Sequence, residues 1–535
     1  MAFAPESFTD DERRILQPYF TNLDSHVFAL TNLPETVKGA LFARYSRSAK
    51  SLRRLFLDEF AGNVGGAAAE GAAVGVERAE KLYAKVFNEY GDDSVAQLGG
   101  AHVACEYVSN VLTKVLEWGR LMAYLEQSTR YVPYTDKLHG RWRYHVPTEV
   151  QGALRERYVD VMDRAFEAYA SLIDGMQRHF AERYPKAPQD SDGVHRAAIR
   201  AKALDTLRGM LPAATQSNVG IYGTGQAYEA LLLRMQAHPL EEVRACGARM
   251  LAELRTIIPA FLTRVDQPER GGRWSAYLAS TRTAMHALAG NLLSDLDPEP
   301  RAEVTLTDFD PDGEVKIVAA TLYAASDLPD DQLLAIARAM TPDDRLAVLR
   351  AYVGARANRR HRPGRAFERT AYRFDVLTDY GAFRDLQRHR LLTLEWQTLS
   401  TRHGYSEPDA LGEAGALGPW TRVMDASADL YEALRAAGLD AAAPYAVAMA
   451  YRVRFYMEMN AREAMHLIEL RTAPQGHPAY RRVCQQMHRL IADRAGHTAV
   501  AGAMTFVDHS EVELERLKSE REIERKRTTA THNVK

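Results

Sequence analysis

The stretch YRFDVLTDYGAFRDLQRHR, Tyr372–Arg390, joins three features in succession. Bulky and β-branched residues at its start predict a strand over 372–377, and YGAFRDLQ (380–387) predicts a short helix. A basic triplet, Arg-His-Arg, follows directly. Farther along, NAREAMHLIELR (460–471) has the apolar spacing of an amphipathic helix and ends in an arginine. The order is therefore strand, helix, basic motif and a distal helix ending in Arg.

The first half of the chain shows a similar order. HVACEYVS (102–109) predicts a strand, VLTKVLEWGRLMAYLE (111–126) has helical spacing, and GTGQAYEALLLRMQAHP (223–239) follows later. Arg234 and Arg471 each end an apolar helix, and each is followed shortly by His-Pro. This shared order indicates an internal repeat of two diverged copies.

The predicted fold class is α+β: two tandem domains, each a small antiparallel sheet packed with helices, meeting about a pseudo-twofold axis as a pseudo-dimer. SDLDPEPRAEV, rich in turn formers, separates two halves of similar size. The expected domains are residues 1–297, residues 298–515 and a charged C-terminal tail, 516–535, a charged helix that ends in disorder.

Other elements are predicted from local pattern. A Gly/Ala-rich loop is expected at 60–75, and a long helical stretch at 147–236 with breaks at 186–193 and 220–225. In the second half the expected strands are 304–309 and 315–324, and the expected helices are 330–340 and 343–353.

Composition excludes several classes of protein. Lys+Arg 68 against Asp+Glu 70 gives a net charge of -2, so no global excess of positive charge indicates a nucleic-acid binder. Cys105, Cys246 and Cys484 lack CxxC spacing, which argues against a zinc site from cysteines and against a disulfide framework. No apolar run approaches the roughly 18 residues of a membrane helix. We expect a cytoplasmic protein with no membrane contact, no nucleic-acid partner and no metal site.

Three motifs carry a resemblance to a known family. EQSTRY (126–131), RHR (388–390) and NAREAMHLIELR (460–471) together resemble the flavin-dependent thymidylate synthases, the ThyX family. The signature of that family runs RHRxxSxNExSxRY and is followed downstream by an Asn-x-Arg helix ending in Arg. In this chain the signature is split between the two copies.

The first copy keeps the back of the signature and the second keeps the front. The retained residues are Glu126, Ser128, Arg130 and Tyr131 in the first copy, and Arg388, His389, Arg390, Asn460, Arg462 and Arg471 in the second. Trp118 and Gly119 stand where the first copy should have Arg and His. In the second copy, the Asn, Glu, Ser and Arg of the signature are replaced by Glu395, Trp396, Thr398 and Ser400.

The resemblance implies a nucleotide site shared between subunits of a homotetramer, which here would be a homodimer forming a pseudo-tetramer. It implies reductive methylation of dUMP to dTMP with FAD as cofactor and with NADPH and methylenetetrahydrofolate as co-substrates. Carried over residue by residue, it assigns catalysis to Glu126, Ser128 and Arg471. It assigns substrate binding to Glu126, Ser128, Arg130, Arg388 and Arg471, and cofactor binding to Arg388, His389, Arg390, Asn460, Arg462 and His466.

The intact pieces of the two copies are complementary. Bringing the first-copy loop against the second-copy motifs would rebuild one full site, in which the arginines hold phosphates through charge-assisted contacts. The opposite pairing would join Trp118 and Gly119 to Trp396 and Ser400 and leave a degenerate site. The three scattered cysteines offer no activated nucleophile, which is compatible with a flavin-dependent reaction.

Each motif also has a plainer interpretation. The RHR triplet alone resembles a solvated helix end, and Glu126 and Arg130 have the i,i+4 spacing of an ordinary helical ion pair. RRHRPGR (359–365) has the composition of a phosphate or nucleic-acid patch, which a nearly neutral chain makes less favoured. Two further functions stay open: a non-catalytic ThyX-like scaffold, and a flavoenzyme acting on another pyrimidine nucleotide.

Overall fold

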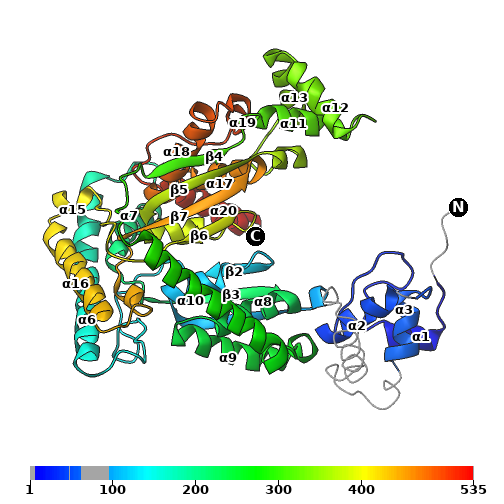
Figure 1. The fold of residues 1–535 in the computed structure, drawn as a ribbon, viewed down its shortest axis with the longest axis horizontal. Coiled ribbons are helices and arrows are strands. Elements are labelled where there is room, and N and C mark those ends of the chain that lie inside the picture. The colour runs from blue at the N-terminus through cyan, green and yellow to red at the C-terminus, as the bar shows by residue number, and fades with distance from the viewer. Residues whose placement is uncertain (1–5, 47, 62–95, 534–535) are drawn as a thin grey trace. The chain divides into compact units, whose positions relative to one another are not determined.

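The computed structural model describes residues 6–46, 48–61 and 96–533 of the chain. The Gly/Ala-rich loop expected at 60–75 therefore lies, from residue 62 on, outside the described residues. Contacts divide the chain into two compact units (Figure 1): unit 1 is Met1–Glu106, Gly119–Glu126 and Asn218–Leu296, and unit 2 is Tyr107–Trp118, Gln127–Ser217 and Asp297–Lys535. A large part of the first half of the sequence thus belongs to unit 2.

Unit 1 is built around a three-stranded sheet with the order β1-β3-β2. Its strands are β1 (Gly100–Ser109), β2 (Met122–Glu126) and β3 (Gln216–Thr224), and β2 pairs antiparallel with β3. Its helices are α1 (Asp10–Leu16), α2 (Glu35–Tyr45), α3 (Leu52–Leu55), α8 (Gly225–Gln236), α9 (Glu241–Arg255) and α10 (Arg273–Leu293).

Two predictions for this region were wrong. The helix expected over 111–126 is limited to α5 (Asn110–Leu116), because 122–126 is strand β2, whose backbone pairs with β3. The helical stretch expected over 147–236 was wrong at 216–219, which begins strand β3; the break expected at 220–225 falls at the end of that strand and the start of α8. In both cases the partner strand decides the conformation, which local spacing does not encode.

Unit 2 contains a four-stranded sheet with the order β4-β5-β7-β6. Its strands are β4 (Val304–Phe309), β5 (Ala371–Asp379), β6 (Thr393–Trp396) and β7 (Arg452–Asn460), and all neighbouring pairs are antiparallel. Alternate residues of the central strands are buried, among them Tyr372, Phe374 and Val376 of β5. This period of two confirms the strand expected over 372–377.

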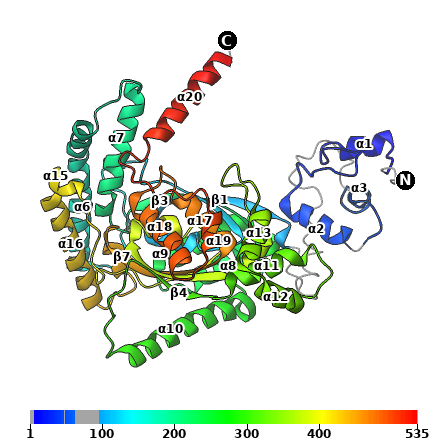
Figure 2. The same ribbon diagram turned by 90° about the horizontal axis from the view of Figure 1, so that it is seen from above.

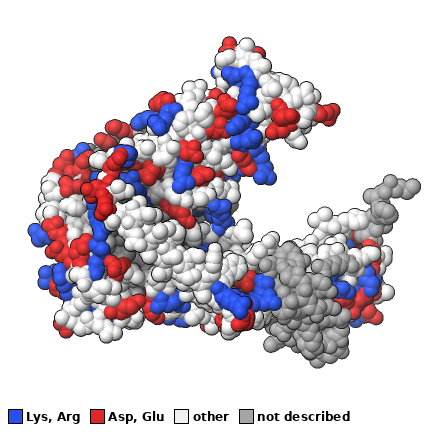
Figure 3. All heavy atoms as spheres, in the orientation of Figure 1, with Lys and Arg blue, Asp and Glu red and all other residues white. Residues whose placement is uncertain are grey.

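Helices complete unit 2. They are α5, α6 (Gly152–Arg183), α7 (Asp192–Leu207), α11 (Gly313–Tyr323), α12 (Asp330–Ala339), α13 (Pro342–Val353), α14 (Tyr380–Leu386), α15 (Ala410–Glu413), α16 (Leu417–Ala436), α17 (Ala461–Arg471), α18 (Pro478–Asp493), α19 (Thr498–Ala503) and α20 (Leu517–Asn533). Both ribbon views show α6 running beside α16 (Figures 1 and 2). On the face drawn in Figure 3, acidic and basic side chains are interspersed, as the small net charge requires.

Two elements of unit 2 differ from the expectation. VKIVAATLYA is helix α11 rather than a strand, because its apolar residues pack against α12 and α13 in spite of their β-branched content. The C-terminal tail, expected to end in disorder, is helical through Asn533. Ion pairs hold the start of α20 against α7, including Arg521 with Asp190 at 2.5 Å.

The internal repeat is visible in the order of elements. The first copy has the order β1, α5, β2, β3, α8, α9, and the second copy has the corresponding order β5, α14, β6, β7, α17, α18. In the sheets, β3 lies between β1 and β2, and β7 likewise lies between β5 and β6. Equivalent helices also have equivalent N-caps: Ser109 and Asp379 cap α5 and α14, and Thr224 and Asn460 cap α8 and α17. The pseudo-dimer arrangement of the copies stays a prediction.

The copies meet within unit 2 where the segments before β3 and β7 run antiparallel. The backbone N–H of Ala213 donates to the carbonyl of Val447 at 2.8 Å, and that of Met449 donates to Leu211 at 2.9 Å. None of the helices in the described ranges combines the length and the hydropathy needed to cross a membrane.

Candidate functional site

Arg130, from the first copy, is buried against the second copy. Its guanidinium donates to both carboxylate oxygens of Asp205 at 2.7 and 2.6 Å, and its third nitrogen donates to the hydroxyl of Tyr480 at 3.1 Å. Burial alone would lower the pKa of Arg130, but the charge of Asp205 more than offsets it and raises that pKa. The loop itself is fixed by Ser128, whose hydroxyl accepts from the backbone N–H of Arg130 at 3.2 Å. Arg130 is therefore a permanent, rigidly held cation.

Arg471, the last residue of α17, approaches the same tyrosine. Its guanidinium carbon lies 5.4 Å from the ring centroid of Tyr480, and its Nε donates to His389 Nε2 at 2.9 Å. Arg471 also contacts Asp385, which forms an ion pair with Arg388. Within unit 2 the structure thus brings Arg130 and Arg471 to one side chain, Tyr480.

Asp385 is the shared anion of this cluster. Burial would raise the pKa of Asp385, yet Arg388 and Arg471, and then Arg208 and Arg130, lower it well below the ordinary value. The carboxylate is therefore charged at neutral pH. The guanidiniums that the sequence assigns to phosphate binding already face carboxylates of the chain itself.

His389 lies behind this cluster, between Arg471 and Glu463. Burial, reinforced by Arg471 and His466, lowers the pKa of His389 well below 6.5, so its ring is neutral. Because Nε2 accepts from Arg471, the proton belongs on Nδ1, which faces Glu463 Oε1 at 3.4 Å. Burial raises the pKa of Glu463 to about 7 and lowers that of His466 to about 4.

These last three residues have the chemistry of metal ligands. One ligand atom from each of His389, Glu463 and His466 lies within 4.8 Å of the other two. Guanidiniums, however, dominate their surroundings: Arg362 and Arg462 act electrostatically on both Glu463 and His466. A field of this sign opposes a divalent cation and favours an anion.

The remaining predicted cofactor residues lie at the start of α17 or near it. Asn460 is the N-cap, and its side-chain oxygen accepts from the backbone N–H of Glu463 at 2.9 Å. Arg462 donates to the carbonyl of Pro363 at 2.9 Å, which attaches the RRHRPGR loop to this helix. Arg390 is exposed. Asn460 and Arg462 therefore spend part of their bonding capacity on the chain itself.

A second attachment fixes the RRHRPGR loop. Arg356 makes a bidentate, fully buried ion pair with Glu469 of α17, with both contacts at 2.6 Å. The loop is thus held rigidly beside the RHR triplet.

Two of the four residues of the degenerate pairing, Trp118 and Trp396, meet in unit 2. The rings of Trp118 and Trp396 are edge to face with centroids 5.9 Å apart, and Trp118 Nε1 donates to the carbonyl of Leu394 at 3.2 Å. Ser400 is buried, whereas Gly119 belongs to unit 1. Glu126, at the end of β2, is also a unit 1 residue and is buried.

Sequence reasoning missed four residues of the cluster: Asp205, Arg208, Asp385 and Tyr480. Asp385 stands three residues before Arg388, a spacing that predicts an ion pair on a helix. No local signal marks Asp205, which is 75 residues from Arg130. Arg208 is the most informative of the four. It is buried, lies 3.8 Å from Asp385, and among the described residues its Nη2 has no hydrogen-bond partner.

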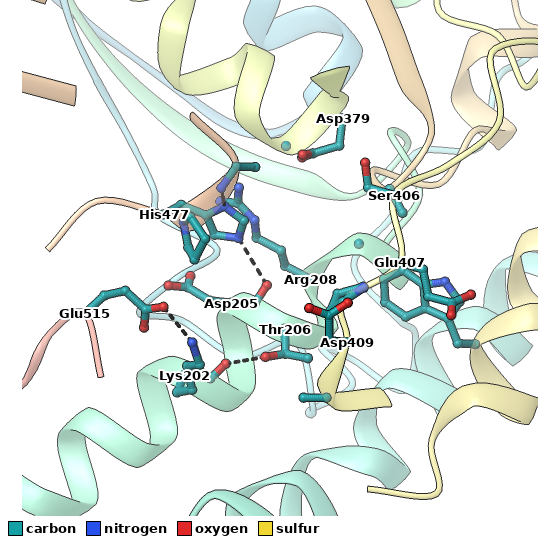
Figure 4. Close-up of a pocket in the computed structure, with 18 of the residues that line it drawn as sticks. Lys202, Asp205, Thr206, Arg208, Asp379, Ser406, Glu407, Asp409, His477 and Glu515 are labelled. Atoms are coloured by element: carbon teal, nitrogen blue, oxygen red, sulfur yellow. Dashed lines mark hydrogen bonds and ion pairs between the residues drawn. The ribbon is translucent and has the colours of Figure 1, made fainter. Parts of the chain in front are cut away.

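Arg208 and Asp205 line a cavity of about 480 Å³ in unit 2 (Figure 4). Its wall combines carboxylates and cations with apolar groups that include Trp420. His477 faces the carbonyl of Asp205 at 3.4 Å, and Lys202 pairs with Glu515 at 2.6 Å. A buried, unsatisfied guanidinium nitrogen beside such a cavity fits a small anionic molecule.

The fold and site together define a class: a duplicated α+β protein whose two copies contribute arginines to one buried cluster of guanidiniums and carboxylates. A sequence profile of the thymidylate synthase complementing protein family matches residues 40–260 and 305–495, and the chain belongs to this family as a tandem pair of its domains.

Full-length relatives are similar. The chain is 39% identical over 520 residues to a UPF0159 protein of Chlamydia muridarum (strain MoPn / Nigg), covering 96% of this chain and 98% of the relative. It is 30% identical over 514 residues to a UPF0159 protein of Thermoplasma acidophilum, covering 90% of this chain and 97% of the relative. Among solved structures, a UMP/dUMP methylase PolB from Streptomyces cacaoi bound with 5-Br dUMP matches 38% of this chain and 97% of its own, at 20% identity and a TM-score of 0.29.

Proposed function

We propose that the chain is a flavin-dependent thymidylate synthase that methylates dUMP to dTMP at a hybrid site. The observation that carries the proposal is the meeting of Arg130 from one copy and Arg471 from the other on Tyr480. Family membership supports a methyltransferase of the thymidylate synthase type. Convergence of two half-motifs on one side chain is what an active fusion requires.

Arg208 supports recognition of the nucleotide phosphate. A buried guanidinium nitrogen without a hydrogen-bond partner costs free energy, and a phosphate oxygen entering the 480 Å³ cavity would satisfy it. Asp205 and Asp385 keep the neighbouring cations ionised and in place before the substrate arrives. Preorganised cations of this kind bind an anion without paying for rearrangement.

The residues beside α17 are positively charged, which matches the negative diphosphate of a flavin. Arg390 and Arg362 are exposed, and both act electrostatically on Glu463, so a diphosphate would meet a positive field there. Arg390, Arg462 and His466 would hold the cofactor, which when bound supplies hydride chemistry with NADPH as reductant and methylenetetrahydrofolate as carbon donor.

Near the cofactor the chain itself supplies a pair of side chains, His389 and Glu463, that can hold a proton. His389 is neutral, so its Nδ1–H can point at Glu463 while Arg471 remains on Nε2. Glu463, with a pKa of about 7, takes up or releases a proton near neutral pH and so sets the charge of this pair.

The test is titration of the purified protein with dUMP and FAD, followed by flavin absorbance and calorimetry. We expect one nucleotide and one flavin per chain, and anaerobic formation of dTMP when methylenetetrahydrofolate and NADPH are supplied. Arg471→Ala should weaken dUMP binding by about tenfold to a hundredfold, the loss of one charge-assisted contact. Arg402→Ala, at an exposed arginine outside the Arg130–Arg471 cluster, is the control and should change binding less than twofold, or about 0.4 kcal/mol.

One observation favours a second candidate, a non-catalytic scaffold. Asp205 and Asp385 already neutralise the guanidiniums assigned to phosphate, which a purely structural core would also do. The two candidates differ in a simple measurement. A protein that binds neither dUMP nor FAD after reconstitution contradicts the synthase and leaves the scaffold, whereas two equivalent sites per chain contradict the hybrid site alone.

A further inference from the structure

The C-terminal helix α20 forms one wall of a groove on unit 2. Lys202 of α7 pairs with Glu515 at 2.6 Å, Arg521 donates to both oxygens of Asp190 at 2.5 and 2.8 Å, and Ser191 donates to Glu524. Acidic groups at this junction are therefore already paired. The wall is fixed in place by five charged side chains and one hydroxyl.

The groove has a volume of about 750 Å³ and is strongly basic. It is lined by residues of α6, α7, the loop after β2 and the start of α20. Its charged members are Arg130, Arg178, Arg196, Arg200, Arg516 and a single carboxylate, Glu520. Arg130 is paired with Asp205 and Arg516 with Glu520 at 2.8 Å, so these two cations are compensated.

The other three arginines are not. Within the part of the chain that the structure describes, Arg178, Arg196 and Arg200 have no ion pair or side-chain hydrogen bond, and all three are exposed. Arg196 helps to lower the pKa of Asp192, but the ion pair of Asp192 is with Lys186, at 2.5 Å. Three uncompensated guanidiniums therefore face one groove.

Their geometry suits a short chain of anions. Arg196 and Arg200 are four residues apart on α7, which places them on one face of the helix about 6 Å apart along its axis. Arg178 faces the same groove from α6. Beside them Tyr131 is 55% exposed, and Arg516 covers one side of its ring at 4.1 Å from the centroid.

We infer that this groove binds the phosphate chain of a small polyphosphorylated molecule, such as a nucleoside triphosphate. Guanidinium is the side chain best matched to phosphate, and a groove of this volume is the size of a small-molecule site. Three guanidiniums confined to one groove can contact only a few phosphates, which fits a short phosphate chain better than an extended polynucleotide. The three uncompensated arginines are not residues on which the synthase proposal depends, so either proposal can fail without the other.

The experiment is calorimetric titration of the full chain with inorganic tripolyphosphate and, separately, with ATP and dTTP. We expect saturable binding with one site per chain. The double variant Arg196→Glu/Arg200→Glu should weaken it by about a hundredfold, since each arginine supplies a charge-assisted contact. Arg155→Glu makes one such Arg-to-Glu change, half the charge change of the double variant, at an exposed position of α6 outside the groove and should alter affinity less than about twofold.

Comparing tripolyphosphate with ATP and dTTP distinguishes a free polyphosphate ligand from a nucleotide ligand. If Tyr131→Ala weakens ATP or dTTP but not tripolyphosphate, the base rests on that ring and the ligand is a nucleotide; equal affinities for all three indicate free polyphosphate. The inference is overturned if no ligand saturates, if Arg155→Glu loses as much affinity as the double variant, or if only single-stranded oligonucleotides bind. Because the substituted residues are exposed, an unchanged circular dichroism spectrum is expected and serves as the folding control.

Discussion

Breaking the ion pair between Arg130 and Asp205 should destabilise unit 2 severely. Arg130→Met would leave a buried carboxylate without its two charge-assisted contacts of 2.7 and 2.6 Å and would also remove the bond to Tyr480. Breaking a buried pair from one side costs about 3–5 kcal/mol. Asp205→Asn should cost a similar amount, because it leaves the cation buried in the same place.

The double variant distinguishes this explanation from a loss of packing. With both charges gone, the penalty for an uncompensated charge disappears, so Arg130→Met/Asp205→Asn should be more stable than the sum of the single changes by about 2–3 kcal/mol. Urea unfolding followed by tryptophan fluorescence measures this, since Trp420 is buried in unit 2.

An exposed ion pair supplies the control. Arg164 and Asp160, an i,i+4 pair on α6 with side chains 73% and 52% exposed, should give less than about 1 kcal/mol in the same cycle. If Arg130→Met costs no more than Arg164→Met, the buried pair is not what holds this part of unit 2 together, and the reasoning from burial is refuted. Because Arg130 variants are expected to be less stable, a loss of nucleotide binding counts as a binding effect only in a variant that is still folded under the assay conditions.

Three further outcomes are expected. Burial raises the folded pKa of Glu463 from 4.5 to about 7. The contribution of this group to the free energy of unfolding should therefore be fully present below about pH 4.5 and fall by roughly 3 kcal/mol as the pH rises to 7. Glu463→Gln should abolish this pH dependence of the urea midpoint. Burial, with Arg282 and Arg244, lowers the folded pKa of His238 from 6.5 to about 4, so its contribution should be lost as the pH falls through that range, and His238→Gln should show a smaller acid loss. Trp396→Ala removes the contact with Trp118 and should shift tryptophan emission while leaving one dUMP bound per chain; a change in stoichiometry would count against a degenerate pairing.

The sheet strands with a period of two were predictable from sequence. Tyr372, Phe374 and Val376 alternate with polar residues because one face of β5 is buried, and that alternation is written locally. The segment 315–324 carries equally β-branched residues without that alternation, and it is a helix because α12 and α13 cover it. Composition without periodicity therefore misled the assignment.

The site was predictable only in part, because some of its residues belong to local motifs and others are defined only by contacts between distant parts of the chain. Arg388, His389 and Arg471 belong to motifs that can be read along the chain. Asp205, by contrast, acquires its role from a contact with Arg130 across the fold. A carboxylate that neutralises a cation 75 residues away leaves no trace in local spacing. The cations were therefore predictable from motifs, whereas the counter-ion Asp205 was visible only in the structure.

The distribution of the first copy over both units has a consequence for dissection of the gene. Helices α6 and α7 precede the repeat boundary, yet both belong to unit 2: α6 packs on α16, and α7 carries Asp205, the partner of Arg130. A fragment starting at residue 298 would lack them and would expose the apolar side of α16, including the buried Trp420 and Leu430. Expressed alone it should aggregate, whereas the two halves produced together from separate reading frames should reassemble. The second half therefore depends on the first to cover the apolar side of α16.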